Sequence, residues 1–413
     1  MPNIKQLHLK MKAEKGIYYY LYFLFFVFSL LYMLGANTRL GIYGVIASDL
    51  KYFILIISIV VFFLCIPKYS PRQLVLVTFL GLLVFIVGVK TENLEQLYLY
   101  LMMIIGAKDI PFRDVIKVHF FIVLGFCLFN MAASELGMME KMVNTVPDER
   151  LGVFGQDVMR KDFGYGWSTD YAIHVFFILL DYWILKAGRF ACVEYLFYAF
   201  AAVFVVVETD SRMATVNIIL IIICELYIRH IKDCHKVSRF LVFFMVYSIP
   251  FFCVLSILAT IAYDSSNLFW IGADLLLSNR LSLGHSAIED VGVPLFGQVY
   301  KMYGAGNAGF GDAEYNFLDC AYVQSFVVCG FLFSLVLICL YVFICKNALT
   351  RRDYPLMMAI LLSGIAGVIA PYTFNLKYCI LLVAIVSKHN NKNHLLIKKH
   401  HVFRLRNYYN YDI

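Results

Sequence analysis

Long apolar runs, separated by short charged segments, form the pattern of hydrophobic and polar positions along this chain. A helix needs about 15 to 23 apolar residues to cross a bilayer, and about twelve runs meet that length. Lys108 ends the run that begins at Leu94 early, and Asn375 and Lys377 lie near the start of the last run. The predicted spans are 17–34, 52–66, 73–89, 94–107, 118–134, 168–185, 190–207, 213–228, 240–262, 317–345, 355–370 and 372–387. The pattern therefore predicts an all-α, polytopic integral membrane protein with one membrane domain over residues 1–413.

Composition supports this fold class. Hydrophobic residues make up 62% of the 413 positions and charged residues 15%, with a mean hydropathy of +0.76, whereas soluble domains carry roughly a quarter charged residues. The first apolar run follows a basic stretch but lacks a convincing small-residue cleavage site, so we expect an uncleaved first span. The 11 cysteines lie mostly inside apolar runs and form no C-x-x-C pair. Neither a disulfide framework nor a metal site is therefore expected.

The distribution of charge predicts the orientation. Roughly two thirds of the lysines and arginines fall in the segments on the side of the termini, which the positive-inside rule places in the cytoplasm. This orientation leaves two long outer loops, 135–167 and 263–316, and a basic cytoplasmic tail, 388–413. Functional residues concentrate on such loops. The net charge of +7 is then an anchor to anionic lipid, with no nucleic-acid partner expected.

Two arginines border the first half of this outer face. Arg212 closes the segment from Glu208 that links two predicted spans, and its guanidinium fork suits a diphosphate. An equally weighted reading is that Arg212 pairs with Asp210 or Glu208 and anchors the helix end. Arg160 opens a segment with two glycines and several aromatic rings, in which Asp170 or the preceding threonine caps the sixth span. Aromatic rings suit sugar faces, and they also suit the interfacial belt of any membrane protein.

The large loop and the span that follows it supply further candidates. Arg280 lies in this loop, and His285 is a general base or a bystander. Asp319 and Tyr322 begin the tenth predicted span, where a carboxylate can accept a proton, hold a guanidinium or cap the helix. The glycine run after Gly304 has the spacing of a dinucleotide fingerprint, but it follows no strand, so we reject that reading.

The interior of the predicted bundle carries few ionisable residues away from its cytoplasmic ends. Asp181 lies near Lys186, and Glu225 precedes Arg229 by four residues, a helical ion-pair spacing. A coupled transporter would be expected to carry charged residues at mid-membrane. The sequence therefore disfavours a transporter, although a flippase of lipid-linked sugars stays an alternative.

Taken together, these segments resemble the Wzy-type polymerases of bacterial O-antigen, capsule and exopolysaccharide, which are related to the O-antigen ligases. The resemblance covers most of the chain as topology and is more specific at short motifs. Two departures are visible: Thr169-Asp170 stands where many relatives have proline-asparagine, and the histidine-asparagine pair of the ligases is absent. The similar segments are Arg160–Asp170, Thr209–Arg212, Asn279–Leu281 with Leu295–Gly297, and Leu318–Tyr322 with Cys329–Phe331.

The resemblance implies a metal-independent glycosyltransferase without a cofactor, in the plasma membrane of a bacterium. It implies that Arg212 and Arg280 hold the departing diphosphate and that Arg160 positions the donor or the acceptor. Asp319, His285 and Tyr322 are the candidate catalytic residues, for proton transfer or for orienting an arginine. In-line displacement at an anomeric carbon needs a stabilised leaving group and a positioned hydroxyl, which this arrangement would supply.

The implied donor is a polyprenyl-diphosphate-linked oligosaccharide, and the implied acceptor is a second lipid-linked repeat unit. Membrane lipids, a chain-length regulator and a flippase are further candidate partners. Two alternatives remain open on the sequence: a lipid-linked oligosaccharide flippase, and a ligase-like transferase that differs only in its acceptor.

Overall fold

The computed structural model describes residues 4–36, 38–39, 43–139, 143–147, 157–234, 237–304 and 315–389. These residues are mainly helical, and β1 and β2 form a small antiparallel ribbon in which Val143 is opposite Lys161. The elements are α1 (Ile4–Gly35), α2 (Tyr43–Cys65), η1 (Ile66–Lys68), α3 (Pro71–Lys90), α4 (Leu94–Ile105), α5 (Phe112–Glu135), β1 (Val143–Pro147), β2 (Asp157–Lys161), α6 (Ser168–Lys186), α7 (Cys192–Thr209), α8 (Arg212–Cys234), α9 (Arg239–Val246), α10 (Ser248–Ile261), α11 (Leu268–Leu276), α12 (Arg280–Val291), α13 (Ala321–Gln324), a π turn (Ser325–Cys329), α14 (Phe331–Thr350), α15 (Tyr354–Gly367) and η4 (Ile380–Ile385).

Seven helices of the described chain are long and apolar enough to cross a membrane, and an eighth span results if α9 and α10, bent by 66°, are counted together. The prediction of a helical, membrane-embedded protein is confirmed by these helices. The predicted number of twelve is not reached. The helix α6, at the predicted span 168–185, is not among these helices although it has 19 residues, and α4 and α15 have only 12 and 14 residues. A helix of that length spans about 20 Å, less than the hydrocarbon thickness of about 30 Å.

The predicted twelfth span, 372–387, is not an α-helix, and this part of the prediction is wrong. The chain from Val368 to Cys379, named here the irregular segment, is held by turns, and only the short η4 follows. Asn375 explains the difference, because its side-chain oxygen accepts a hydrogen bond from the backbone N–H of Lys377 at 3.2 Å. Such side-chain bonds to nearby backbone compete with helix formation. Non-helical backbone is tolerated at membrane depth where protein encloses it.

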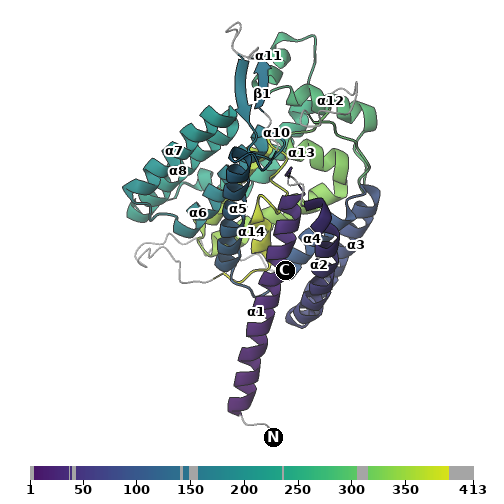
Figure 1. Cartoon of the computed structure of the whole chain (residues 1–413), viewed down its shortest axis with the longest axis vertical. Coiled ribbons are helices and arrows are strands. Elements are labelled where there is room, and N and C mark those ends of the chain that lie inside the picture. The colour runs from purple at the N-terminus through teal and green to yellow at the C-terminus, as the bar shows by residue number, and fades with distance from the viewer. Residues whose placement is uncertain are drawn as a thin grey trace.

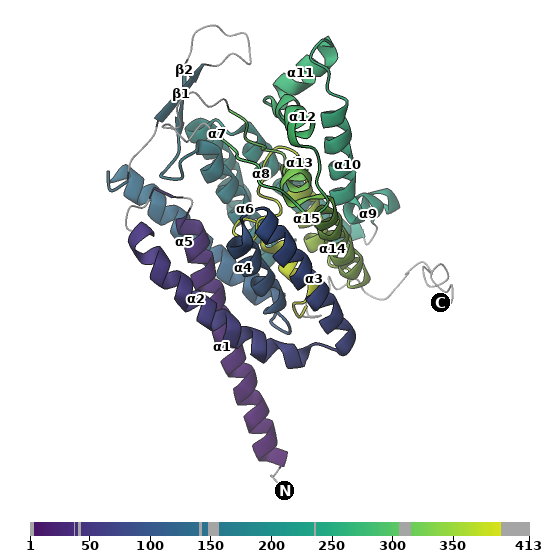
Figure 2. The same ribbon diagram turned by 90° about the vertical axis from the view of Figure 1, so that its right-hand side faces the viewer.

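Helices that follow each other in the chain pack in pairs, α1 with α2, α3 with α4, α5 with α6 and α7 with α8, around a centre formed by α6 and α15. Nearly all of α15 is buried, where it contacts α8, α10 and α14. The ribbon β1–β2, α11 and α12 gather at one end of the molecule, named here the ribbon end, while α1 projects from the opposite end (Figures 1 and 2). The two predicted outer loops therefore contribute to the same end of the bundle.

The large predicted loop, 263–316, is more ordered than the sequence indicated. It contains α11 and α12, and the side chain of Asp274 joins them by accepting hydrogen bonds from the backbone N–H of Leu281 at 2.8 Å and of Ser282 at 3.2 Å. Residues 305–314, which include most of the glycine run, lie outside the described residues, as do most of the predicted tail and the 148–156 part of the first loop.

Two of the short motifs in the second half of the chain lie against each other. Gly297 and Gly330 have φ of +90° and +88°, values that L side chains rarely adopt. The backbone N–H of Phe331 donates to the carbonyl of Pro294 at 2.8 Å, and Gln298 donates to Val328 at 2.9 Å. This junction fixes the end of the large loop to the start of α14.

Replacing Gly330 with alanine should destabilise the protein. A Cβ at this position would lie 2.9 Å from the carbonyl oxygens of Pro294 and Leu295, and overpacking together with the positive φ costs about 2 kcal/mol or more. The thermal unfolding midpoint of Gly330→Ala in detergent should fall by several degrees. Gly125→Ala is the control, because nothing lies within 4 Å of a Cβ there; equal midpoints for the two variants would contradict this account.

Candidate functional site

Arg160 and Arg212 share one carboxylate, that of Asp210. Arg160 donates through Nε to Asp210 at 3.1 Å and through Nη2 to the same oxygen, while Arg212 Nε lies 3.7 Å from the other oxygen. The Arg160 side chain is 10% exposed and the Arg212 side chain 43%. The pairing of Arg212 with Asp210, which the sequence left open, is therefore present. Arg160 is nearly buried and donates two hydrogen bonds to Asp210, whereas the side chain of Arg212 is more exposed.

The junction between α7 and α8 places these groups. Asp210 adopts the left-handed conformation, φ 48°, as the C-cap of α7, and its N–H donates to the carbonyl of Val206. Glu208, two residues earlier, pairs with Lys161 of β2. Two ion pairs thus fix the ribbon to the α7–α8 junction.

Arg280, the first residue of α12, joins three separate segments of the chain. Its Nε donates to the carbonyl of Ile369 at 2.7 Å, its Nη1 donates to the carbonyl of Leu277 at 2.8 Å, and its Nη2 lies 3.4 Å from Asp319. The hydroxyl of Tyr315 also donates to Asp319, at 3.3 Å. Burial raises the pKa of the Asp319 carboxyl, and the charge of Arg280 and the hydrogen bond from Tyr315 oppose that shift.

Asp170, at the start of α6, lies beside this group. It accepts a hydrogen bond from the hydroxyl of Tyr372 in the irregular segment, and the charges of Lys377 and Asp319 act on it. Asp170, Arg280 and Asp319, named here the charged cluster, come from three distant parts of the chain. From the sequence, Asp170 is predicted only to cap α6.

His285 and Tyr322 make their contacts elsewhere. His285 Nδ1 lies 3.0 Å from the carbonyl of Thr260 and Nε2 lies 3.2 Å from Glu289, so the imidazole packs between α10 and α12. Tyr322 is fully buried, and its hydroxyl donates to the carbonyl of Gly364 in α15 at 2.9 Å. Within the described residues, neither side chain forms a hydrogen bond or an ion pair with the charged cluster.

Several titratable side chains are buried among the described helices, including His119, His174 and Asp181. Asp170, His174 and Asp181 are spaced i, i+4 and i+11 along α6, which places them on one face. His119 of α5 contacts Asp181, with Nδ1 at 2.5 Å from the carboxylate, and its Nε2 lies 3.3 Å from the carbonyl of Lys377. The helical spacing on α6 was the sequence signal that could have revealed this face.

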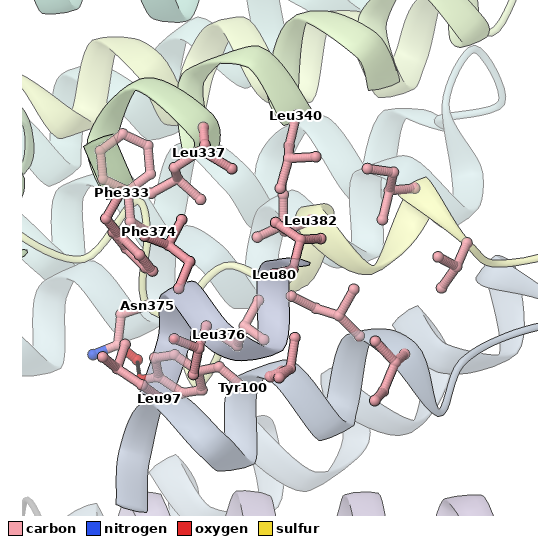
Figure 3. A pocket seen from close by; sticks show the side chains of 18 of the residues that line it. Leu80, Leu97, Tyr100, Phe333, Leu337, Leu340, Phe374, Asn375, Leu376 and Leu382 are labelled. Atoms are coloured by element: carbon pink, nitrogen blue, oxygen red, sulfur yellow. Dashed lines mark hydrogen bonds between the residues drawn. The ribbon is translucent and has the colours of Figure 1, made fainter. Parts of the chain in front are cut away.

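A large apolar chamber adjoins the charged cluster. It has a volume of about 1510 Å³ and lies between α14 on one side and α3 and α4 on the other, with the irregular segment forming part of its wall (Figure 3). The lining follows α3 from Gln73 to Thr91, and a 20-residue helix is about 30 Å long. The chamber thus extends over a length that matches the hydrocarbon of a bilayer.

Most side chains of the chamber are aliphatic or aromatic, as the labelled Leu80, Leu337 and Phe333 illustrate (Figure 3). One polar chain crosses its wall: Gln96 donates to the hydroxyl of Tyr100 at 2.6 Å, and Tyr100 donates to Asn375. Tyr372 and Lys377 also line the chamber, so its wall connects directly to the charged cluster through the bond from Tyr372 to Asp170.

No family model matches this chain, and no curated protein or solved structure matches it either. The geometry of the chamber and of the charged cluster is therefore the basis for a functional proposal.

Asp210→Asn should destabilise the protein because it leaves the Arg160 guanidinium buried without its carboxylate. Asparagine tolerates the left-handed conformation, so the change removes only the charge. Breaking a buried ion pair costs about 3–5 kcal/mol, and the thermal unfolding midpoint in detergent should fall clearly. Glu208→Gln is the matched control, since its pair with Lys161 is more exposed and worth about 0–1 kcal/mol. Equal shifts for both variants would refute the assigned role of Asp210.

Proposed function

We propose that this protein is a glycosyltransferase that joins polyprenyl-diphosphate-linked oligosaccharide repeat units, and that it works at the outer face of a bacterial plasma membrane. One observation supports this proposal above the others: an apolar chamber of bilayer length lies directly beside a cluster of charged side chains. A ligand that fits both parts has a long hydrocarbon chain and a polar, anionic head, as a lipid-linked sugar does.

The chamber suits the polyprenyl chain. Each CH₂ group that leaves water for an apolar site contributes about 0.8 kcal/mol, although a chain that comes from the bilayer is already out of water. Selection of the chain then depends on the shape and length of the site. The chamber lining follows α3 from Gln73 to Thr91, and the length of this 20-residue helix matches the hydrocarbon layer of about 30 Å.

The charged cluster suits the diphosphate and the reacting sugar. Arg280 is already placed by the carbonyls of Ile369 and Leu277, and its remaining donors near Asp319 point to where a diphosphate would bind. A diphosphate that takes the place of Asp319 beside Arg280 releases this carboxylate. Fixed donors that face a departing anion stabilise the transition state without reorganisation.

In the proposed reaction, a hydroxyl oxygen of the acceptor sugar forms a bond with the anomeric carbon of the donor. The bond between this carbon and the diphosphate oxygen breaks, and the diphosphate keeps the electron pair beside Arg280. Asp319 accepts the proton of the attacking hydroxyl and later passes it to water or to the departed diphosphate. Arg212, the most exposed of the three arginines, binds the second lipid-linked unit at the ribbon end.

The alternative of a flippase for lipid-linked sugars gains support from one observation. The chamber reaches from the ribbon end to Lys68, Lys108 and Lys388 at the opposite end, and ionisable residues and broken helices at membrane depth are typical of transport pathways. Loss of a polymerase would leave single repeat units at the outer leaflet, whereas loss of a flippase would leave them at the inner leaflet.

Arg280→Gln should stop chain growth after one repeat unit. In a strain that lacks this protein, the wild-type chain should restore long glycans, whereas Arg280→Gln should leave single units at the outer leaflet and Arg212→Gln should shorten the chains. Arg72→Gln is the control, because Arg72 is exposed in the first turn of α3. Glycan length by gel electrophoresis and protein level by membrane blot are the measurements.

Two other outcomes of this complementation would change the proposal. Long chains in the strain without the protein would rule out a polymerase. Repeat units that stay at the inner leaflet of that strain would indicate a flippase.

The activity should fall on acidification in a manner that depends on Asp319. Only the carboxylate form accepts a proton, so the rate decreases as the pH falls through the pKa of Asp319, which lies above the ordinary value of 3.8. Polymerisation by purified protein in liposomes of varied external pH measures this profile. Asp319→Asn should lower the rate by roughly 100-fold or more, as loss of a general base does, and should flatten the acid limb. An unchanged limb in Asp319→Asn would assign the base to another residue.

A further inference from the structure

Lys377 lies in the irregular segment, and its surroundings differ from those of an ordinary lysine. The residue is 7% exposed and lines the apolar chamber. Its ammonium lies 5.0 Å from the centre of the Tyr378 ring, and among the described residues none accepts a hydrogen bond from it or forms an ion pair with it. Three N–H donors are thus available to a molecule inside the chamber.

A buried ammonium without acceptors is costly, and ionisable residues at membrane depth are generally paired or functional. The charge of Asp170 acts on Lys377, yet the two side chains do not form an ion pair. Asp170 already accepts the hydrogen bond from Tyr372. The charge of Lys377 is therefore only partly compensated by the protein itself.

The backbone of Lys377 is fixed on both sides. Its N–H donates to the side chain of Asn375 at 3.2 Å, and its carbonyl lies 3.3 Å from His119 Nε2. His119 is in turn held by Asp181 at 2.5 Å. This buried His–Asp pair supports the backbone from which the lysine side chain enters the chamber, so the ammonium is placed before a ligand arrives.

Of the other three lysines that line the chamber, Lys388 is exposed, whereas Lys68 and Lys108 have partners. Lys108 lies 3.5 Å from the side-chain oxygen of Gln73 and faces the Tyr69 ring at 5.1 Å, and Lys68 lies 2.9 Å above the Tyr18 ring. Both are at the end opposite the ribbon. Lys377 is the chamber lysine next to the charged cluster, because its charge and that of Asp170 act on each other.

We infer that Lys377 is an anion-binding residue that receives a phosphate of the lipid whose chain occupies the chamber. The identity of this lipid as a polyprenyl diphosphate rests on the proposed function, whereas the need for an anionic head rests on Lys377 alone. The diphosphate would lie between Lys377 and Arg280, and its approach would supply the acceptors that the ammonium lacks. Lys377 binds and orients the lipid and takes no proton in the reaction.

Native mass spectrometry of the purified full-length protein tests this inference with two probes of equal chain length, a polyprenyl diphosphate and the corresponding polyprenol. The wild-type protein should bind the diphosphate at least tenfold more tightly than the alcohol. Lys377→Gln should reduce this preference by about tenfold, with unchanged affinity for the alcohol, which also shows that the chamber is folded. Lys377→Arg should keep most of the preference, and Lys108→Gln, the matched control, should keep all of it.

Several results would overturn the inference. One is a wild-type protein without preference for the diphosphate, and another is a Lys377→Gln variant with the wild-type preference. A purely structural role as the counter-ion of Asp170 makes a different prediction, because Asp170→Asn combined with Lys377→Gln would then restore the preference. If Lys377→Gln does not bind the alcohol, the preference for the diphosphate is measured in Lys377→Arg and in the double variant. Retention in Lys377→Arg and loss in the double variant support anion binding, and a preference restored in the double variant supports the counter-ion role.

This test is independent of catalysis, since the probes carry no sugar and no turnover occurs. A preference for the diphosphate that depends on Lys377, together with unchanged glycans in the strain that lacks the protein, would support the anion-binding role of Lys377 and contradict the polymerase function. Loss of long glycans together with a preference that is insensitive to Lys377 would support the polymerase and reject the anion site.

Discussion

The hydrogen bond from Tyr372 to Asp170 joins two segments 202 residues apart, and the proposed site depends on it. It attaches the irregular segment to the first turn of α6, one of the most buried helices of the bundle. Non-helical backbone cannot face lipid, because its polar groups need partners. The irregular segment meets this requirement through neighbouring elements: Thr373 accepts from Tyr341 and donates to Ser363, and Asn375 accepts from Tyr100. The hydrogen bond from Tyr372 to Asp170 therefore fixes the wall of the chamber to the edge of the charged cluster.

The arginines that the sequence singled out divide into two groups with different environments. Arg160 is committed to Asp210, and its low exposure and double contact indicate that it fixes the ribbon to the α7–α8 junction. Arg280 also holds backbone carbonyls, but its contact with Asp319 is longer, at 3.4 Å, and an anionic ligand can replace this contact. The distinction rests on the partners of each guanidinium and on burial. Spacing along the chain carries neither kind of information.

Much of the fold follows from the hydropathy pattern, because a helix satisfies its own backbone in lipid and an apolar run of sufficient length predicts one. The pattern failed where side chains compete with the helix. Asn375 competes with helix formation in the run 372–387 through its bond to the backbone of Lys377. The apolar residues of α11 did not distinguish a helix at the ribbon end from a loop. The pairing of the motifs at Gly297 and Gly330 required the three-dimensional structure, since these glycines are far apart in sequence.

The site was harder to predict than the fold. Asp319 and Arg280 were selected individually, and the structure brings them together, but Asp170 and Lys377 were not recognised as part of a site. The sequence indicates Lys377 only as an interruption of a predicted span, because hydropathy reflects the cost of a charge and does not identify a partner for it. The face of α6 that carries Asp170 and His174 was readable from helical spacing. The contact of this face with a segment near the C-terminus was not, because such contacts arise only from tertiary packing.

The most direct test of the central claim is a cryo-electron microscopy structure of the wild-type protein in nanodiscs with a bound polyprenyl diphosphate. The account predicts a hydrocarbon chain in the chamber between α14 and the pair α3 and α4, with the phosphates between Arg280 and Lys377 and with Asp319 displaced from Arg280. A lipid bound outside the chamber, or one whose phosphates lie away from both cations while the Arg280–Asp319 contact is intact, would contradict it.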